Sequence, residues 1–153
     1  HVTDHTNASR TMIYDIKNLT WDDTLLKALE IPTSILPKVQ ASSSHFGDIN
    51  LNGTKIPIYG VAGDQQASLF GQGGFKAGIA KNTYGTGCFM LLNTGNKQVL
   101  SQSGLLTTLT CSLESEEIQY ALEGSVLVGI RASLHLLKIK EDLLPCSKYI
   151  AQP

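Results

Sequence analysis

The sequence predicts an α/β protein, and three observations lead to that prediction. An apolar, β-favouring run at 56–61 is followed directly by helix-compatible residues at 65–70. Beyond the glycine-rich residues 71–74, four β-favouring segments alternate with turn residues. From Ser125 onward, apolar residues recur at helical spacing, so a helix is expected to pack on the preceding strands.

The first part of the chain predicts short elements joined by loops. Residues 3–9 are rich in side chains that hydrogen-bond nearby backbone, so we expect a loop there. Thr20 is the expected N-cap of a short helix at 22–29. The apolar stripe of this helix would consist of Trp21, Leu25, Leu26 and Leu29. Two prolines then interrupt the helical period, which predicts a turn and a short helical piece near Thr33.

The middle of the chain predicts a hairpin signal, a strand-to-helix junction and a hinge. Residues 41–53 are expected to be irregular surface with a hairpin-like Asn-Gly at 52–53. Asp64 follows the strand expected at 56–61 and would stand where that strand passes into a helix. The run 71–74 is the most flexible by composition and is the expected hinge between two lobes.

The second part of the chain predicts mainly strands. They are expected at 78–84, 88–93, 105–111 and 118–123. Gly85, Thr86 and Gly87 form the turn between the first two strands, and the polar run 112–117 separates the last two. The helical period after them is carried by Val126, Ile130, Leu134 and Leu137.

Composition describes a globular chain without a charged binding surface. With 153 residues, 42% hydrophobic and 16% charged, the chain is long enough to bury a core. Twelve basic and thirteen acidic residues give a net charge of −1 with no basic cluster, which disfavours nucleic acid and anionic membrane as partners. The apolar runs are too short to span a bilayer. Three scattered cysteines argue against a disulfide framework or zinc knuckle and favour a cytoplasmic location.

The strongest chemical signal is the pairing of Asp64 with the turn at Gly85, Thr86 and Gly87. A carboxylate at the end of a strand can accept a proton from a hydroxyl, and a Gly-Thr-Gly turn offers N–H groups and a hydroxyl to phosphate oxygens. Together they predict phosphoryl transfer. Considered singly, Asp64 would be a helix N-cap and the glycines an ordinary turn. The chain has no Walker-type motif, so this phosphate site is not a P-loop.

Five motifs, in order along the chain, resemble the FGGY carbohydrate kinases. They lie at 3–12, 60–67, 80–90, 104–108 and 120–125. The resemblance implies a partial actin-like ATPase fold, with lobes of ribonuclease H type on either side of a cleft. On this basis residues 1–72 complete the first lobe and carry the catalytic Asp, whereas residues 73–153 begin the second lobe and carry the phosphate-binding hairpin. Because the chain opens at His1 rather than Met, we expect a piece of a longer polypeptide.

The resemblance also implies an enzyme and assigns roles. The amino-acid sequence around Asp64 is similar to that of family members that use ATP and Mg²⁺ to convert glycerol to sn-glycerol 3-phosphate. Asp64 would be the catalytic base near the Mg²⁺, and Gln65 and Phe89 would contact glycerol. The nucleotide phosphates would lie against Gly85, Thr86, Gly87 and Gly129. The full-length enzyme would be a homo-oligomer, and the isolated piece is expected to be inactive.

Two departures from the family pattern and two alternatives accompany this interpretation. Residues 129–136 lack the family's nucleotide-contacting Gln, so the adenine-side contacts are expected to differ. The segment 49–55 is shorter than the loop that binds fructose 1,6-bisphosphate in some bacterial members, so that regulation is not expected. The alternatives are another FGGY kinase acting on a sugar or polyol, and a non-catalytic metabolite-binding module.

Overall fold

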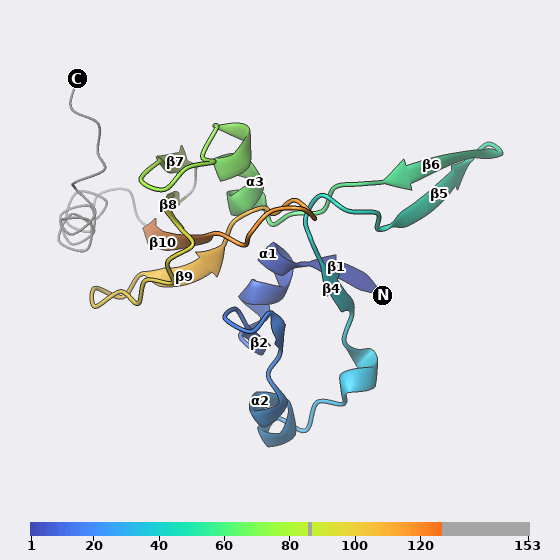
Figure 1. Ribbon diagram of the computed structural model, residues 1–153, viewed down its shortest axis with the longest axis horizontal. Helices are drawn as coiled ribbons and strands as arrows, with labels where there is room; N and C mark the ends of the chain where they lie inside the picture. Colours follow the sequence, from blue (N-terminus) through green and yellow to red (C-terminus); the bar gives the residue numbers. More distant parts are fainter. Residues whose placement is uncertain (86, 127–153) are drawn as a thin grey trace. The chain divides into compact units, whose positions relative to one another are not determined.

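The computed structural model of the chain describes residues 1–85 and 87–126 (Figure 1). These residues form two compact units. Unit 1 contains residues 1–63 and 111–118, and unit 2 contains residues 64–110 and, of the described C-terminal part, 119–126. Helices and both parallel and antiparallel strand pairs occur in the chain, so the α/β class expected from the sequence is confirmed.

Unit 1 opens with a strand rather than a loop. Its first elements are β1 (Val2–Asp4), α1 (His5–Ala8), η1 (Ser9–Thr11), β2 (Tyr14–Asp15) and β3 (Thr20–Trp21). β1 pairs in parallel with β4 (Lys38–Gln40), and Asp4 at its end is the N-cap of α1. The loop expected at 3–9 is therefore wrong. Polar side chains that favour a loop also cap a helix, and the strand partner is remote in sequence.

Both helical pieces expected in this unit are present. They are α2 (Asp23–Ala28) and η2 (Thr33–Ile35). The N-cap of α2 is Asp22, whose carboxylate accepts two backbone N–H groups of the first turn at 2.9 Å, whereas the expected cap Thr20 lies in β3. Only Leu26 of the expected stripe is buried; Leu25 and Leu29 are 41% and 58% exposed within the described residues. This six-residue helix therefore buries one side chain.

The Asn-Gly signal at 52–53 is confirmed as a β-hairpin. The hairpin joins β5 (Gly47–Leu51) to β6 (Thr54–Ile58). Asn52 and Gly53 both have left-handed backbones, with φ of 52° and 83°, as a type I′ turn requires. Residues 47–51 are thus a strand rather than irregular surface. The strand expected at 56–61 ends at Ile58 because its partner β5 begins opposite that residue.

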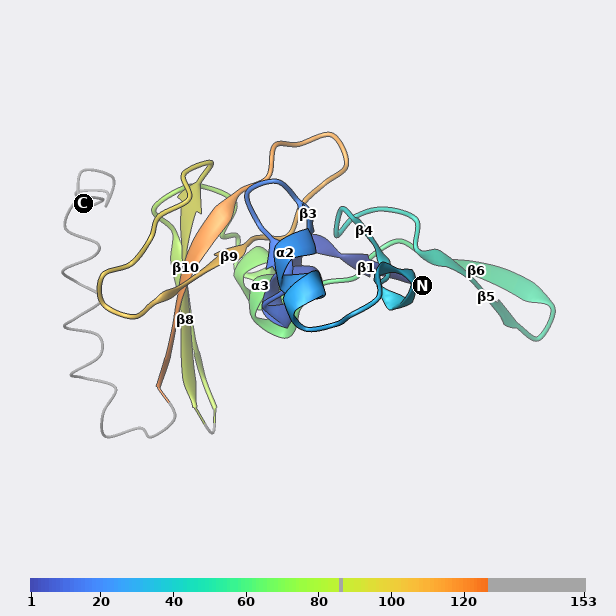
Figure 2. The same ribbon diagram turned by 90° about the horizontal axis from the view of Figure 1, so that it is seen from below.

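Unit 2 combines one helix with a four-stranded antiparallel sheet. Its elements are α3 (Asp64–Gly71), β7 (Ala80–Tyr84), β8 (Cys88–Gly95), β9 (Leu106–Leu109) and β10 (Tyr120–Val126). The strand order is β7-β8-β10-β9, and Figure 2 shows β8 and β10 side by side. All four predicted strands are confirmed. The helix expected from Ser125 is wrong at residues 125–126, because these pair with the start of β8, a contact remote in sequence. The rest of that expected helix lies outside the described residues.

The buried face of α3 packs on the sheet of unit 2. Leu69 forms an apolar cluster with Leu91 of β8 and Ala121 of β10. The helix ends at a glycine cap: Gly73 has a left-handed backbone, with φ of 78°, and the N–H of Gly74 donates to the Leu69 carbonyl at 2.9 Å. The glycine-rich run 71–74 thus closes the helix, and its role as a hinge between two lobes stays a prediction.

Candidate phosphoryl-transfer site

Asp64 is the first residue of α3, and its carboxylate is exposed. Its Oδ1 accepts the backbone N–H of Gln65 at 2.8 Å, and its Oδ2 accepts the side-chain Nε2 of Gln65 at 3.1 Å. The carboxylate stands at a helix start but not at the end of a strand, because β6 already stops at Ile58 and residues 59–63 have no regular structure. An exposed carboxylate at a helix N-terminus keeps lone pairs available for a ligand.

A buried polar network in unit 1 holds the backbone just before Asp64. The side chain of Asp4 is fully buried, and its Oδ2 accepts the hydroxyls of Thr6 and Ser42, each at 2.7 Å. Thr6 Oγ1 in turn accepts the backbone N–H of Gly63 at 2.7 Å. Because the Thr6 hydroxyl both donates to Asp4 and accepts from Gly63, the residue preceding the predicted base is held by a charge-assisted chain.

Lys81, on β7, connects α3 to the neighbouring strands of unit 2. Its side chain is 3% exposed. Nζ donates to Gln65 Oε1 at 2.5 Å, to Thr83 Oγ1 at 2.8 Å and to the carbonyl of Phe89 at 3.3 Å. Burial lowers the pKa of Lys81, and the charges of Glu123 and Asp64 oppose this shift by raising it. The buried ammonium therefore has three hydrogen-bond acceptors and acidic neighbours, as a charge in the interior requires.

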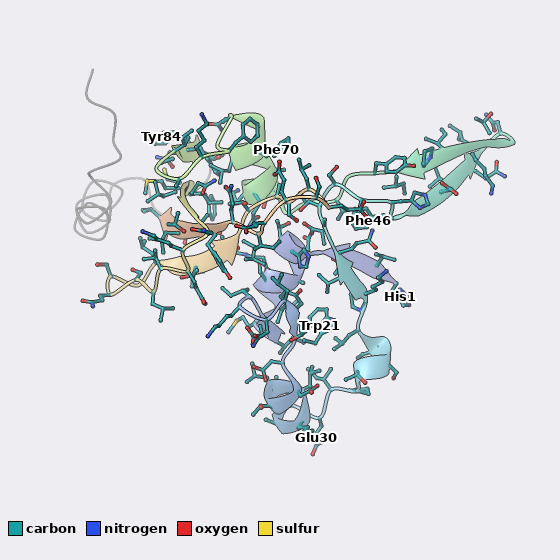
Figure 3. All side chains as sticks on the ribbon, in the orientation of Figure 1. His1, Trp21, Glu30, Phe46, Phe70 and Tyr84 are labelled. Carbon is teal, nitrogen blue, oxygen red and sulfur yellow. The ribbon has the colours of Figure 1, made fainter. Side chains whose placement is uncertain are left out.

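The predicted phosphate turn joins β7 to β8. Tyr84 and Cys88 form the last residue pair before it, and the exposed Tyr84 is labelled in Figure 3. The N–H of Gly85 donates to the Gly87 carbonyl at 2.9 Å, which closes the turn. A Cβ at Gly87 would lie 3.2 Å from both the ring of Phe89 and the Val126 carbonyl oxygen. The turn therefore leaves little room for a side chain at this position.

The structure places several of the predicted site residues in one network. Asp64 and Gln65 bond to each other, and Lys81 links Gln65 to Phe89. Phe89 takes part through its carbonyl, whereas the ring that was expected to line the pocket packs against Gly87. Gly85 and Gly87 follow along the same hairpin. The other two predicted residues, Thr86 and Gly129, lie outside the described residues.

Lys81 is the residue of this site that sequence reasoning missed. In the sequence it is one of several polar residues in a β-favouring run, next to Ala80 and Asn82. The signal that could have found it is period-two alternation, because a lysine on the inward side of a strand needs a buried acceptor. Its partner on α3 is distant in sequence, so no local pattern identifies it.

Asp64 is the exposed carboxylate of this site to which a magnesium ion could bind. In the part of the chain that the structure describes, no group of three or more His, Cys, Asp or Glu side chains could hold a metal ion. Magnesium is commonly bound by one or two carboxylates together with substrate phosphates and water. The exposed Asp64 fits that donor set, whereas a metal site made wholly of protein ligands does not.

Comparison with known proteins relates this chain to sugar kinases. The family model described as the N-terminal domain of the FGGY family of carbohydrate kinases matches residues 1–71. The glycerol kinase of Alkaliphilus oremlandii is 53% identical to this chain over 161 residues, which cover 99% of the chain and 31% of the relative. The glycerol kinase of Clostridium perfringens strain 13 is 61% identical over 132 residues, covering 84% of the chain and 26% of the relative. The chain thus spans less than a third of the length of these relatives.

Solved structures give the same result for the fold. Plasmodium falciparum glycerol kinase with ADP aligns with a TM-score of 0.79 and 42% identity, covering 91% of this chain and 29% of that one. Gluconate kinase from Lactobacillus acidophilus aligns with a TM-score of 0.68 and 26% identity, covering 84% and 27%. The chain therefore shares the fold of part of these sugar kinases, which belong to the actin-like ATPase class. Within that class, the chain belongs to the FGGY family of carbohydrate kinases.

The helices of the described residues are short. None has the length and apolar character needed to cross a membrane.

Proposed function

We propose that this chain is the central part of an ATP-dependent glycerol kinase, which transfers the γ-phosphoryl group of ATP to a terminal hydroxyl of glycerol and forms sn-glycerol 3-phosphate. The observation that carries the proposal is the exposed Asp64 carboxylate at the start of α3, paired with Gln65. The identity of 53% to a glycerol kinase over nearly the whole chain supports it.

In the proposed reaction Asp64 accepts the proton of the attacking hydroxyl. As the substrate oxygen bonds to the γ-phosphorus, the bond from that phosphorus to the bridging oxygen breaks, ADP leaves and the proton passes to the Asp64 carboxylate. A carboxylate with a reference pKa of about 4 is a weak base near neutral pH, so its contribution is placement and late proton transfer. The Gln65 N–H groups, which donate to both carboxylate oxygens, orient that base.

The β7–β8 turn is the proposed phosphate-binding element. Gly87 has almost no space for a Cβ, which supports an approach of backbone rather than side chain to a ligand at this turn. Gly85, Thr86 and Gly129 complete the proposed nucleotide contacts, with Phe89 and Gln65 at the glycerol. Mg²⁺, when bound beside Asp64, would screen the charge of the phosphate oxygens.

The remaining proposals concern the whole kinase. Residues 1–72 would complete its first lobe and residues 73–153 would begin the second, a division supported by the family match that ends at residue 71. The boundary between the two compact units lies before α3, between Gly63 and Asp64. It describes this chain alone and not the lobes of the whole kinase. The kinase would be a cytoplasmic homo-oligomer that binds small molecules and not nucleic acid, and this chain in isolation would be inactive.

A hybrid enzyme tests the proposed activity. In this hybrid kinase, the segment of the Alkaliphilus oremlandii glycerol kinase that aligns with this chain is replaced by the chain itself. Glycerol-dependent formation of ADP is the expected result, with Asp64→Asn as the inactive control. A folded hybrid without turnover on any substrate would favour the non-catalytic module. Because a gluconate kinase shares the fold, gluconate is assayed too, and a preference for it would favour a sister kinase.

A further inference from the structure

Lys81 has a feature that its burial alone does not explain. Its ammonium, 3% exposed, reaches out of the sheet of unit 2 to α3 and donates to the side-chain oxygen of Gln65. Gln65 in turn donates to Asp64 through its side-chain nitrogen at 3.1 Å. The two atoms of one amide thus face two opposite charges, the ammonium on the oxygen side and the carboxylate on the nitrogen side.

We propose that Lys81 is a positioning residue that holds the Gln65 amide in one orientation, so that Gln65 presents an N–H donor, and not a carbonyl, beside Asp64. This inference rests on the proposed kinase function, because it gives a role to the amide at the substrate hydroxyl. Lys81 itself touches neither substrate nor reacting atoms in this account.

The orientation follows from donor and acceptor chemistry. An ammonium has three donors and no acceptor, so only Oε1 of Gln65 can face Lys81. A carboxylate only accepts, so only Nε2 can face Asp64. A flipped amide would set NH₂ against ammonium and carbonyl against carboxylate, which are two repulsive contacts. Both charged neighbours therefore favour the same amide orientation. Among the hydrogen bonds described for the Gln65 side chain, removal of Lys81 would leave only the one to Asp64 to fix that orientation.

The ammonium is itself held in place from the strand side. Thr83 Oγ1 and the Phe89 carbonyl accept its other two protons at 2.8 and 3.3 Å. In the sheet register, Lys81 and Glu123 both stand opposite Leu91, one on each side of β8, so a carboxylate lies on the same face. Because each of the three ammonium protons has an acceptor, the sheet fixes the position of Nζ. The hydrogen bond to Gln65 therefore does not depend on a freely rotating lysine side chain.

The consequence concerns the group that reacts. A hydroxyl has lone pairs and one proton, so it can accept from Gln65 Nε2 while it gives its proton to Asp64. An alkylammonium group at the same place has no lone pair for the Gln65 donor, although it would attract Asp64. The fixed amide therefore selects neutral hydroxyl compounds against amines of the same size, a preference that Asp64 alone would reverse.

A double-mutant cycle in the hybrid kinase tests whether Lys81 acts through Gln65. The four enzymes are the unsubstituted hybrid, Lys81→Met, Gln65→Ala and the double variant, each assayed for kcat and KM with glycerol. We expect Lys81→Met to lower kcat/KM about tenfold in the presence of Gln65, and to change it less than about twofold when Gln65 is already Ala. Equal losses in both backgrounds would show a general structural effect and would overturn the inference.

Controls separate the possible failures. Lys97→Met changes an exposed lysine of the same unit and should leave kcat/KM unaltered. Lys81→Arg keeps a donor-only cation and should retain more activity than Lys81→Met. If the Met variant does not fold, as judged by circular dichroism and gel filtration, the cycle is run with Lys81→Gln, whose amide can donate or accept and therefore no longer selects one orientation of the Gln65 amide. An unsubstituted hybrid that is folded but inactive rejects the proposed function, whereas an active hybrid with additive losses rejects only the role of Lys81.

Discussion

Replacement of Gly74 by Ala should destabilise unit 2, whereas the same change at Gly71 should not. A Cβ at Gly74 would lie 2.3 Å from Leu69 Cδ1, 2.6 Å from Leu69 Cγ and 2.8 Å from the Leu69 carbonyl oxygen. The Leu69 side chain is 1% exposed and packs against Leu91 and Ala121, so it has little space into which to move. A Cβ at Gly71 would meet nothing within 4 Å.

The size of the effect follows from two losses. Forcing an extra methyl group into a packed core costs about 1–3 kcal/mol. Moving the Gly74 backbone away from the Leu69 carbonyl also weakens their hydrogen bond, which contributes about 1 kcal/mol. The expected cost of Gly74→Ala is therefore about 2–4 kcal/mol. Gly71→Ala lies at the end of α3, where helix propensity favours Ala by up to about 1 kcal/mol.

Hydrogen exchange of the α3 amides in the hybrid kinase measures this local effect. A cost of 2–4 kcal/mol corresponds to exchange that is faster by roughly 30- to 1000-fold for amides that open with the helix. Gly71→Ala should leave these rates unchanged or slower. The packing argument would be refuted if the two variants exchanged alike, or if Gly71→Ala were the less protected of the two.

Three further predictions concern the site and unit 1. Asp64→Asn should lower kcat in the hybrid kinase by roughly two or more orders of magnitude, with little change in nucleotide affinity. Near-normal turnover would show that Asp64 is not the base. Asp4→Ala should lower stability by about 3–5 kcal/mol, because it leaves the hydroxyls of Thr6 and Ser42 without their buried acceptor; a melting temperature equal to that of the unsubstituted hybrid would contradict this. Burial, with a smaller contribution from the charge of Asp4, raises the pKa of the Cys111 thiol to about 11. Since the folded state then holds this proton more tightly than the unfolded state, the associated stability is present below about pH 9 and is lost as the pH rises toward 11. Melting curves at pH 8, 9.5 and 11 should show a loss that is smaller in Cys111→Ser, and an identical loss in both proteins would reject the assignment.

Several parts of the fold were predictable because their signals are local. The Asn52-Gly53 turn needs left-handed residues, which that dipeptide tolerates, and the helix expected at 22–29 has an acidic first turn in sequence, although its cap is Asp22 and not the expected Thr20. The four strands of unit 2 were found from β-favouring segments separated by turn residues. Three of the errors share a physical cause: β1, the end of β6 and the end of β10 are set by strand partners that lie elsewhere in the chain.

The candidate site divides in the same way. Asp64, Gln65 and the glycine turn were selected from their motifs, since the family pattern records residue type and order. The Asp4–Thr6–Gly63 chain and the Lys81–Gln65 contact were not found, because each joins residues that are distant in sequence. Alternation along β7 could have placed Lys81 on the inward side of its strand, but no local pattern identifies Gln65 as its partner.

By itself, the sequence determined the class of fold, the family and the chemical types at the site, because these depend on local propensity and on which residues follow one another. Only the tertiary structure decided that Lys81 is buried against Gln65, that Asp4 anchors the backbone before Asp64, and that Gly74 fits against Leu69. The physical reason is that burial and hydrogen-bond partners are created when separate segments pack together, and the cost of a buried charge or an added methyl group exists only in that packed environment.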